Sequence, residues 1–336
     1  MTRAGAAMVL AAGLLAGACA PAGPQAEGGG ARPRAPQELS AAKVDPFQMG
    51  RPDVVLLWTC GTYGMMEICD CAAGDWSAGL SRRGGLLHSY RRAFGPAVYA
   101  LDAGEWTPLD PNDIRTPYVL DAYANAGYDA LTLGVNEWSA GDARLAELLA
   151  GRPMRLLAGN ISSPAAGELP LESELPAEVN GVRLAVVAFC PESSLLFLEP
   201  ERREDLRVGT LQAFVDRVER LKRDGRLVVA VVAGDDESAR QIANASEADV
   251  VVRAYTPKAA GSITQAAGGA WIVKVGGYEL VGALALKVSG GKVTAAEFRA
   301  EPVDARWPID ERNRTLFRQY AAEAVRRMKA AAASPE

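Results

Sequence analysis

The sequence of 336 residues contains a single histidine, His88, and only five cysteines. One imidazole cannot supply a metal centre that needs several histidine ligands, so a site of that kind is excluded. Lysine and arginine number 36 against 41 aspartate and glutamate, which gives a formal net charge of -5. Without an excess of positive charge the chain has no electrostatic footprint for phosphate backbones, and nucleic acid is not expected as a partner.

The sequence also lacks apolar runs long enough to span a bilayer, and its longest apolar run lies near the N-terminus. Residues 1–18 carry one basic residue and then an apolar stretch that is too short to span a bilayer, which is typical of a signal peptide. Ala16-Gly17-Ala18-Cys19 resembles a bacterial lipobox. We therefore expect Cys19 to carry lipid and to hold the protein at the membrane of the bacterial cell envelope, as a periplasmic or outer-membrane lipoprotein. The alternative is an ordinary signal peptide cut after an Ala-x-Ala-like site, with Cys19 discarded or free.

The remaining composition is that of a globular protein with a sizeable core, since 49% of the residues are hydrophobic and 23% are charged. Residues 19–43, rich in proline, glycine and alanine, are expected to form a flexible tether. We expect a single domain over residues 44–330 and a disordered tail over 331–336.

Apolar runs alternate with amphipathic segments through most of the domain, which predicts a largely parallel sheet covered by helices. The expected strands are 54–58, 97–101, 128–133, 155–158, 182–189, 227–232 and 250–252. The expected helices are 78–92, 118–126, 144–150, 211–222, 238–248 and 310–329. Segments 271–275, 280–288 and 292–300 are separated by Gly-Gly pairs, which predicts antiparallel hairpins.

Four cysteines lie within the predicted domain and are its most reactive groups. Cys60 follows the first strand, Cys69 and Cys71 lie in the next loop, and Cys190 ends a later strand. In an oxidising compartment these thiols could form two disulfides that pin the loop, each worth about 2 to 4 kcal/mol. They could instead bind a soft metal ion, exchange disulfides or be inert, and the spacing leaves these alternatives open.

Three motifs resemble the calcineurin-like metallophosphoesterase domain of the periplasmic 5'-nucleotidase and UDP-sugar hydrolase (UshA-like) family. They are residues 78–83, 101–104 and 127–134, which match in order and spacing. The resemblance covers roughly residues 54–300 and implies a four-layer α/β/β/α sandwich with two mixed sheets and a dinuclear metal site at the strand ends. A further resemblance, to UshA-like proteins with a cysteine-rich first loop, favours a role for the thiols.

The metal ligands of that family are largely replaced in this chain. Cys60 and Thr62 stand at its first Asp-x-His motif, Glu137 replaces the histidine after Asn136, and residues 254–257 replace its Gly-His-x-His motif. The remnant metal positions are Cys60, Glu105, Asn136 and Asp235. We therefore expect no dinuclear centre. The carboxylates could hold a single hard metal ion or could be solvated loop groups and helix caps.

Aromatic residues follow several strand ends, where a pocket would need an apolar lining. Trp106, Trp138 and Tyr255 are the candidates, although core packing explains the tryptophans equally well. His88 lies within a predicted helix and is expected to be structural rather than a ligand.

Three functions are open from the sequence. The first is an exported lipoprotein without hydrolytic activity that serves in thiol redox chemistry, metal binding or ligand binding. The second is an active phosphohydrolase of nucleotide-like substrates with a carboxylate metal site. The third is a membrane-tethered module for protein interaction. No cofactor is certain, and the one that the residues suggest is a thiolate-bound metal.

Overall fold

The structure is a computed structural model, and it describes residues 41–70, 75–110, 112–152, 154–163, 169, 171–254 and 261–333. The predicted signal peptide, the lipidation site Cys19 and most of the tether lie outside the described residues. Of the tether, only residues 41–43 fall inside them.

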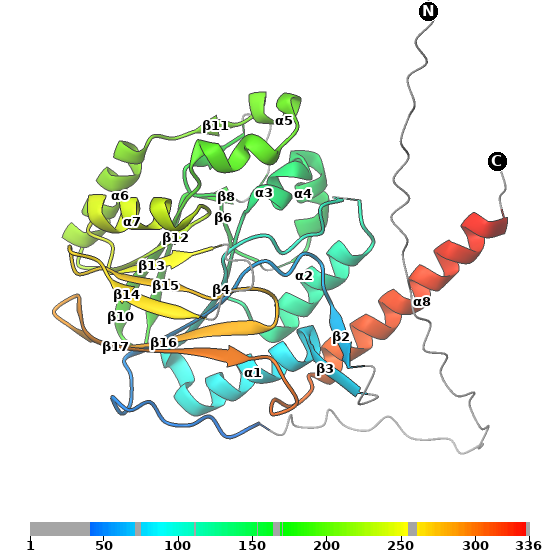
Figure 1. Cartoon of the computed structure of the whole chain (residues 1–336), viewed down its shortest axis with the longest axis horizontal. Helices are drawn as coiled ribbons and strands as arrows, with labels where there is room; N and C mark the ends of the chain where they lie inside the picture. The colour runs from blue at the N-terminus through cyan, green and yellow to red at the C-terminus, as the bar shows by residue number, and fades with distance from the viewer. Residues whose placement is uncertain are drawn as a thin grey trace, which may run out of the picture. The chain divides into compact units, whose positions relative to one another are not determined.

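The first sheet has seven strands in the order β17-β16-β1-β4-β5-β6-β8 (Figure 1). Its strands are β1 (Val54–Thr59), β4 (Val98–Asp102), β5 (Ala130–Thr132), β6 (Leu156–Leu157), β8 (Leu171–Glu172), β16 (Leu280–Ser289) and β17 (Lys292–Pro302). Strands β1, β4, β5, β6 and β8 run parallel, whereas β16 is antiparallel to both β1 and β17. The sheet is therefore mixed.

The second sheet has six strands in the order β14-β15-β13-β12-β10-β9. Its strands are β9 (Glu174–Val179), β10 (Val182–Phe189), β12 (Leu227–Val232), β13 (Val250–Arg253), β14 (Ser262–Gln265) and β15 (Trp271–Lys274). The four central strands are parallel, and the two edge strands are antiparallel to their neighbours. This sheet is mixed as well.

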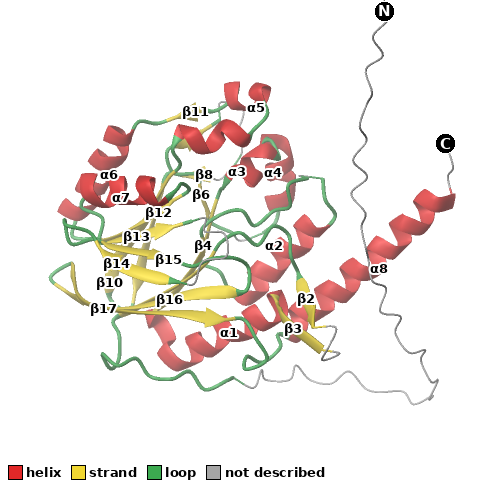
Figure 2. Ribbon diagram, in the orientation of Figure 1, coloured by secondary structure: helices red, strands yellow, loops and turns green. Residues whose placement is uncertain are grey.

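The two sheets pack face to face, and helices cover their outer faces (Figures 1 and 2). The helices of the first sheet are α1 (Leu80–Phe94), α2 (Arg115–Ala126), α3 (Val135–Ser139) and α4 (Asp142–Leu149), and α8 (Glu311–Ala333) packs on α1 and α2. Those of the second sheet are α6 (Leu211–Arg223) and α7 (Asp236–Ala245). The predicted four-layer α/β/β/α sandwich is confirmed.

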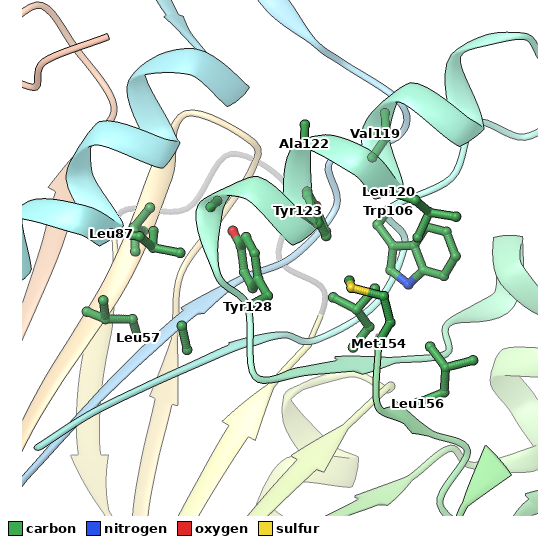
Figure 3. Close-up of a cluster of buried hydrophobic side chains, with 14 of the residues drawn as sticks. Leu57, Leu87, Trp106, Val119, Leu120, Ala122, Tyr123, Tyr128, Met154 and Leu156 are labelled. Atoms are coloured by element: carbon green, nitrogen blue, oxygen red, sulfur yellow. The ribbon is translucent and has the colours of Figure 1, made fainter. Parts of the chain in front are cut away.

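The alternation of side chains along β1 shows how the layers are held together. All six residues of β1 are buried, so the strand contributes to a core on each face. Val54, Leu56 and Trp58 pack between the two sheets with residues of β10 and β12. Val55 and Leu57 belong to the core cluster on the other side, together with residues of α1 and α2. Figure 3 shows Leu57 in this cluster with Leu87 of α1. An apolar run with no polar alternation is what a strand buried on both faces requires.

Helix α2 ends where the sequence predicts. Gly127 adopts a left-handed conformation with φ of 77°, and its N–H donates to the carbonyls of Tyr123 and Ala124. A glycine takes this conformation without a steric penalty, and it satisfies carbonyl groups that the helix end would leave unpaired. Strand β5 can then begin directly after the turn.

Short elements connect the layers. They are β2 (Glu67–Asp70), β3 (Asp75–Gly79), β7 (Ile161–Ser162), β11 (Arg207–Val208), α5 (Pro200–Glu204) and the 3-10 helices η1 (Gly95–Ala97) and η2 (Glu192–Phe197). Strands β2 and β3 pair in the predicted cysteine-rich loop, where the sequence pattern gives no strand signal.

Two predictions from the sequence are wrong at the C-terminal side. Strand β15 does not form a hairpin with β16, because β15 pairs with β13 and β14 in the second sheet while β16 belongs to the first. Helix α8 continues to Ala333, so the expected tail cannot start at residue 331. Among the described residues, no helix has the length and apolar character needed to cross a bilayer.

Candidate functional site

A cavity of about 610 Å³ lies where parallel strands of both sheets end. Its walls come from the loops after β4 and β5 on one side and from η2 and the loops after β12 and β13 on the other. The carboxyl ends of parallel strands are where α/β folds place their ligands. The volume lies within the range of about 300 to 1000 Å³ that is typical of small-molecule sites.

Three of the four remnant metal positions line this cavity, namely Glu105, Asn136 and Asp235. The carboxylate of Glu105 accepts hydrogen bonds from the backbone N–H groups of Val135 at 2.7 Å and of Asn136 at 3.2 Å. The side-chain amide of Asn136 donates to the carbonyl of Thr107 at 3.0 Å. Glu105 and Asn136 therefore tie the loop after β4 to the start of α3.

Gly134 makes this arrangement fit. A side chain at residue 134 would place its Cβ 2.7 Å from Oε1 of Glu105 and 2.8 Å from the backbone nitrogen of Glu105. Such distances are shorter than any real Cβ contact, so the Glu105 carboxylate can reach the first N–H groups of α3 only across a glycine.

Glu137 is fully buried and also binds the loop after β4. Its Oε1 accepts from the backbone N–H of Thr107 at 2.8 Å and from the Thr107 hydroxyl at 2.9 Å. Its Oε2 accepts from the N–H groups of Glu105 at 2.9 Å and of Gly134 at 2.8 Å. The residue that stands where the resembling family has a histidine is thus a structural anchor of the loop.

Burial raises the pKa of both carboxyls. For Glu105 burial is the largest cause, and the neighbouring charge of Glu137 raises its pKa further. Burial also raises the pKa of Glu137, although four hydrogen bonds oppose the shift. It is unfavourable for two neighbouring acidic groups such as these to be charged at the same time, because their charges repel one another.

Asp235, on the opposite wall, caps helix α7. Its Oδ1 accepts from the backbone N–H of Ser238 at 2.8 Å and from the Ser238 hydroxyl at 2.7 Å, and these bonds lower the pKa of Asp235. Arg253 lies beside it, donates to the carbonyl of Gly234 at 3.3 Å and pairs with Asp236 at 3.3 Å. The guanidinium of Arg253 is therefore already bound to acceptor groups of the protein.

Two non-glycine residues at the cavity have left-handed backbone conformations. They are Tyr63, with φ of 49°, and Glu105, with φ of 60°, and the N–H of Tyr63 donates to the carbonyl of Glu105 at 2.9 Å. Such conformations are costly for residues with a side chain and are found most often at functional sites. Tyr63, which the sequence analysis did not single out, belongs to the cavity.

Thr62 lies behind the cavity wall instead of in it. It is buried, bonded to the hydroxyl of Tyr123 at 2.7 Å, and accepts from the guanidinium of Arg83 at 2.8 Å. Asp102 closes the network by accepting from Tyr123 at 2.9 Å and from Thr59 at 2.6 Å. The buried guanidinium of Arg83 and the buried carboxyl of Asp102 are thus linked through hydroxyl groups. This network supports the loop after β1 from the side of α1 and α2.

The two described thiols are free and do not face the cavity. Cys60 packs between the sheets, with its Sγ directed to the carbonyl of Val275 at 3.4 Å, while Cys190 belongs to the cluster on the outer face of the first sheet. They follow β1 and β10, which belong to different sheets, so the strand ends do not bring these two thiols to one sheet edge. Cys71 lies outside the described residues, and Cys69 is described only as part of the β2 backbone.

Burial makes both thiols poor nucleophiles. It raises the pKa of Cys60 to about 12, with a further contribution from Asp102, and raises the pKa of Cys190 to about 12, with a contribution from Glu105. Because the thiolate is the reactive form, these two cysteines are not suited to redox exchange.

Thiol labelling checks this conclusion. With iodoacetamide at pH 7 to 8, peptides containing Cys60 and Cys190 should remain unlabelled in the folded protein and become labelled in denaturant. The expected protection has two causes, the raised pKa and the lack of solvent access. Rapid labelling of either peptide without denaturant, read by mass spectrometry, would restore the redox hypothesis for that cysteine.

The aromatic candidates are not the ones that line the cavity. Trp106 and Trp138 are fully buried core residues, and the indole N–H of Trp106 donates to the carbonyl of Thr132 at 3.1 Å. The prediction that they line a pocket is wrong, because they pack beneath the strand-end loops. Tyr255 lies outside the described residues. The large apolar side chains of the cavity are Leu109 and Phe197, which are 79% and 88% exposed.

The resembling fold implies two metal ions, and the residues at the strand ends do not fit them. A dinuclear centre needs several anionic or imidazole ligands that converge on both ions. Within the part of the chain that the structure describes, no group of three or more histidine, cysteine, aspartate or glutamate side chains could hold a metal ion. His88 does not line the strand-end cavity. Its Nε2 lies 3.1 Å from Oδ2 of Asp310, just before α8.

The chain matches known proteins by its structure and not by its sequence. No protein-family model and no curated protein matches the chain. Solved structures do match. A 5'-nucleotidase precursor from Thermus thermophilus has a TM-score of 0.67 and 18% identity over 82% of this chain and 59% of its own. The sulfate thiohydrolase SoxB of Thermus thermophilus has a TM-score of 0.68 and 18% identity over 84% of this chain and 62% of its own.

A smaller protein matches over almost its whole length. A calcineurin-like phosphoesterase from Bacillus subtilis has a TM-score of 0.65 and 15% identity over 82% of this chain and 98% of its own. The chain thus spans about three fifths of the two Thermus proteins and nearly all of the Bacillus structure. These similarities show that the chain has the metallophosphoesterase-type fold of 5'-nucleotidases, as the motifs predict.

Proposed function

We propose that this protein is a lipoprotein of the bacterial cell envelope that uses a metallophosphoesterase-type fold to bind a small molecule without hydrolysing it. Its ligand occupies the cavity at the strand ends, and lipid on Cys19 holds the domain at the membrane. Of the three non-hydrolytic roles open from the sequence, this is ligand binding.

One observation carries the proposal: the acidic groups at the strand ends are bound to the protein's own backbone. Glu105 and Glu137 together accept five hydrogen bonds from backbone N–H groups, at 2.7 to 3.2 Å. A carboxylate that holds a loop in this way has less capacity to coordinate a cation, and releasing it would leave buried N–H groups unpaired. The cavity itself remains open, and Leu109, Val135 and Phe197 give its lining an apolar part.

The other roles have less support. Thiol redox chemistry would depend on Cys69 and Cys71, because Cys60 and Cys190 are buried with raised pKa values. A phosphohydrolase of this fold would need metal ligands, and the described residues provide no group of three or more histidine, cysteine, aspartate or glutamate side chains that could hold an ion. A protein-interaction module would use the exposed apolar residues at the mouth of the cavity, but these residues border a cavity of small-molecule size.

A metal titration tests the proposal. Purified protein stripped with a chelator and titrated with Mn²⁺ or Zn²⁺ in a calorimeter should show no saturable two-ion site. Glu105→Gln, which keeps the size of the side chain, should give the same titration. Binding of two ions per chain that Glu105→Gln abolishes would contradict the proposal, because the Glu105 carboxylate would then be a metal ligand.

A further inference from the structure

The C-terminal half of α8 leaves apolar and basic side chains exposed together. Residues 325–333 are all exposed. Figure 1 shows this end of the helix extending away from α1 and α2, on which the rest of α8 packs. Val325 is 49% exposed and Met328 is 69% exposed, so packing within the described domain does not explain these two apolar side chains.

The same helix is basic although the whole chain is acidic. It contains six arginine or lysine residues and two glutamates, whereas the formal net charge of the chain is -5. Arg327 pairs with Glu323. Arg318, Arg326 and Lys329 form no ion pair with any of the described residues, so their charges are available to a partner outside the domain.

Helical spacing brings these charges beside the exposed apolar side chains. Arg318, Val325 and Lys329 are separated by whole turns and therefore share one face of α8. Met328 is a neighbour of Val325 on the helix surface, and Arg326 is a neighbour of Lys329, because residues three apart lie side by side. Apolar side chains flanked by basic ones are typical of helices that lie on an anionic membrane surface.

The predicted tether joins the domain beside this helix. The backbone N–H of Ala42 donates to the hydroxyl of Ser89 on α1 at 3.2 Å, and the adjacent His88 contacts Arg312 of α8 at 2.7 Å. Residues 20–40 can span at most about 75 Å, about twice the length of α8, which has 23 residues and is about 35 Å long. Lipid on Cys19 would therefore keep all of α8 within reach of the same membrane.

We propose that the C-terminal half of α8 lies on the anionic surface of the membrane, with Arg318, Arg326 and Lys329 near lipid phosphates and Val325 and Met328 among the headgroups. Attachment through Cys19 raises the effective concentration of the domain at the membrane, so a weak contact is sufficient to orient it. The inference rests on the membrane attachment in the proposed function and adds a second contact with the same membrane.

A chain that carries no lipid tests this contact independently of the anchor. The mature chain from residue 19, with Cys19→Ser, is mixed with vesicles of phosphatidylcholine alone or of phosphatidylcholine and phosphatidylglycerol in equal parts. Cosedimentation should be at least about tenfold stronger with the anionic vesicles, because each basic side chain near such a surface strengthens binding by about fivefold. Salt at about 0.5 M should remove the difference, since it screens exposed charges.

Variants assign the contact to α8. Arg326→Gln combined with Lys329→Gln should lower the affinity for anionic vesicles by about 20- to 30-fold. The matched control is Arg223→Gln combined with Arg240→Gln, which removes the same charge from exposed positions on α6 and α7 and should bind like the parent chain. Met328→Ser should lower the affinity by about threefold, because it replaces an apolar side chain at the headgroups with a polar one.

The results that would overturn the inference are specific. Equal binding to both kinds of vesicle, or anionic binding that the double variant on α8 retains, would overturn the contact. A loss of the same size in the control would show that binding follows net charge alone. Unchanged binding of Met328→Ser would overturn the apolar part of the contact.

Two further outcomes separate the lipid partner from a protein partner and from the anchor. Binding of the basic side chains of α8 to an acidic protein, without binding to vesicles, would overturn the lipid surface as the partner. The proposed function fails separately, if full-length Cys19→Ser protein stays in the membrane fraction of cells as firmly as the wild type after a high-salt wash that removes electrostatic contacts.

Discussion

Replacing Glu137 with alanine is expected to lower the free energy of unfolding by about 3 to 5 kcal/mol. The buried carboxylate accepts four hydrogen bonds, three of them from the backbone N–H groups of Glu105, Thr107 and Gly134. Alanine would leave these donors buried without partners, and each unpaired donor costs about 1 to 3 kcal/mol. Glu137→Gln keeps the shape but turns an amide donor toward other donors, so it should cost less than alanine but still about 1 to 3 kcal/mol.

Urea unfolding measures the effect, with the midpoint expected to fall and the slope to stay the same. Glu147→Ala is the matched control on the next helix, because its carboxylate is 70% exposed and pairs with Arg144 at 2.7 Å. Exposed ion pairs contribute about 0 to 1 kcal/mol, so this variant should be close to wild type. A Glu137→Ala protein as stable as the control would show that the carboxylate does not hold the loop.

The sequence predicts the layers of the fold well, because buried parallel strands have a simple signature. The apolar runs at 54–58, 182–189 and 227–232 correspond to β1, β10 and β12. The error at β15 has a physical origin, since Gly276 and Gly277 indicate a turn but not which sheet each flanking strand joins. Strand β15 joins the second sheet through backbone pairing with β13, about 20 residues earlier in the chain.

The site was less predictable, because its defining contacts join residues far apart in the sequence. Cysteines are conspicuous in a sequence, yet Cys60 and Cys190 are buried by packing that no local pattern encodes. Glu105 and Glu137 appeared as candidate ligands or caps, and only the folded structure shows that each binds the other's loop. One signal could have identified the mouth of the cavity: Leu109 and Phe197 are large apolar residues outside every predicted strand and helix.

Phosphate release is the measurement that tests most directly whether this protein lacks phosphohydrolase activity. The purified protein is expected to release no phosphate above background from nucleotides, UDP-sugars or aryl phosphates with Mn²⁺, Zn²⁺, Co²⁺, Mg²⁺ or Ca²⁺. A two-metal site stabilises both the attacking and the leaving oxygen and activates the nucleophile, and the described residues offer no cluster that could hold such ions. The rate should therefore lie orders of magnitude below that of a metal-dependent phosphatase assayed beside it.

A contaminating enzyme is excluded by assaying Glu105→Ala and Asn136→Ala, purified in the same way, together with the wild type. All three proteins are expected to give the same background with every metal. Metal-dependent turnover of about 1 to 1000 per second by the wild type, lost in Glu105→Ala or Asn136→Ala, would contradict it and would establish an active phosphohydrolase.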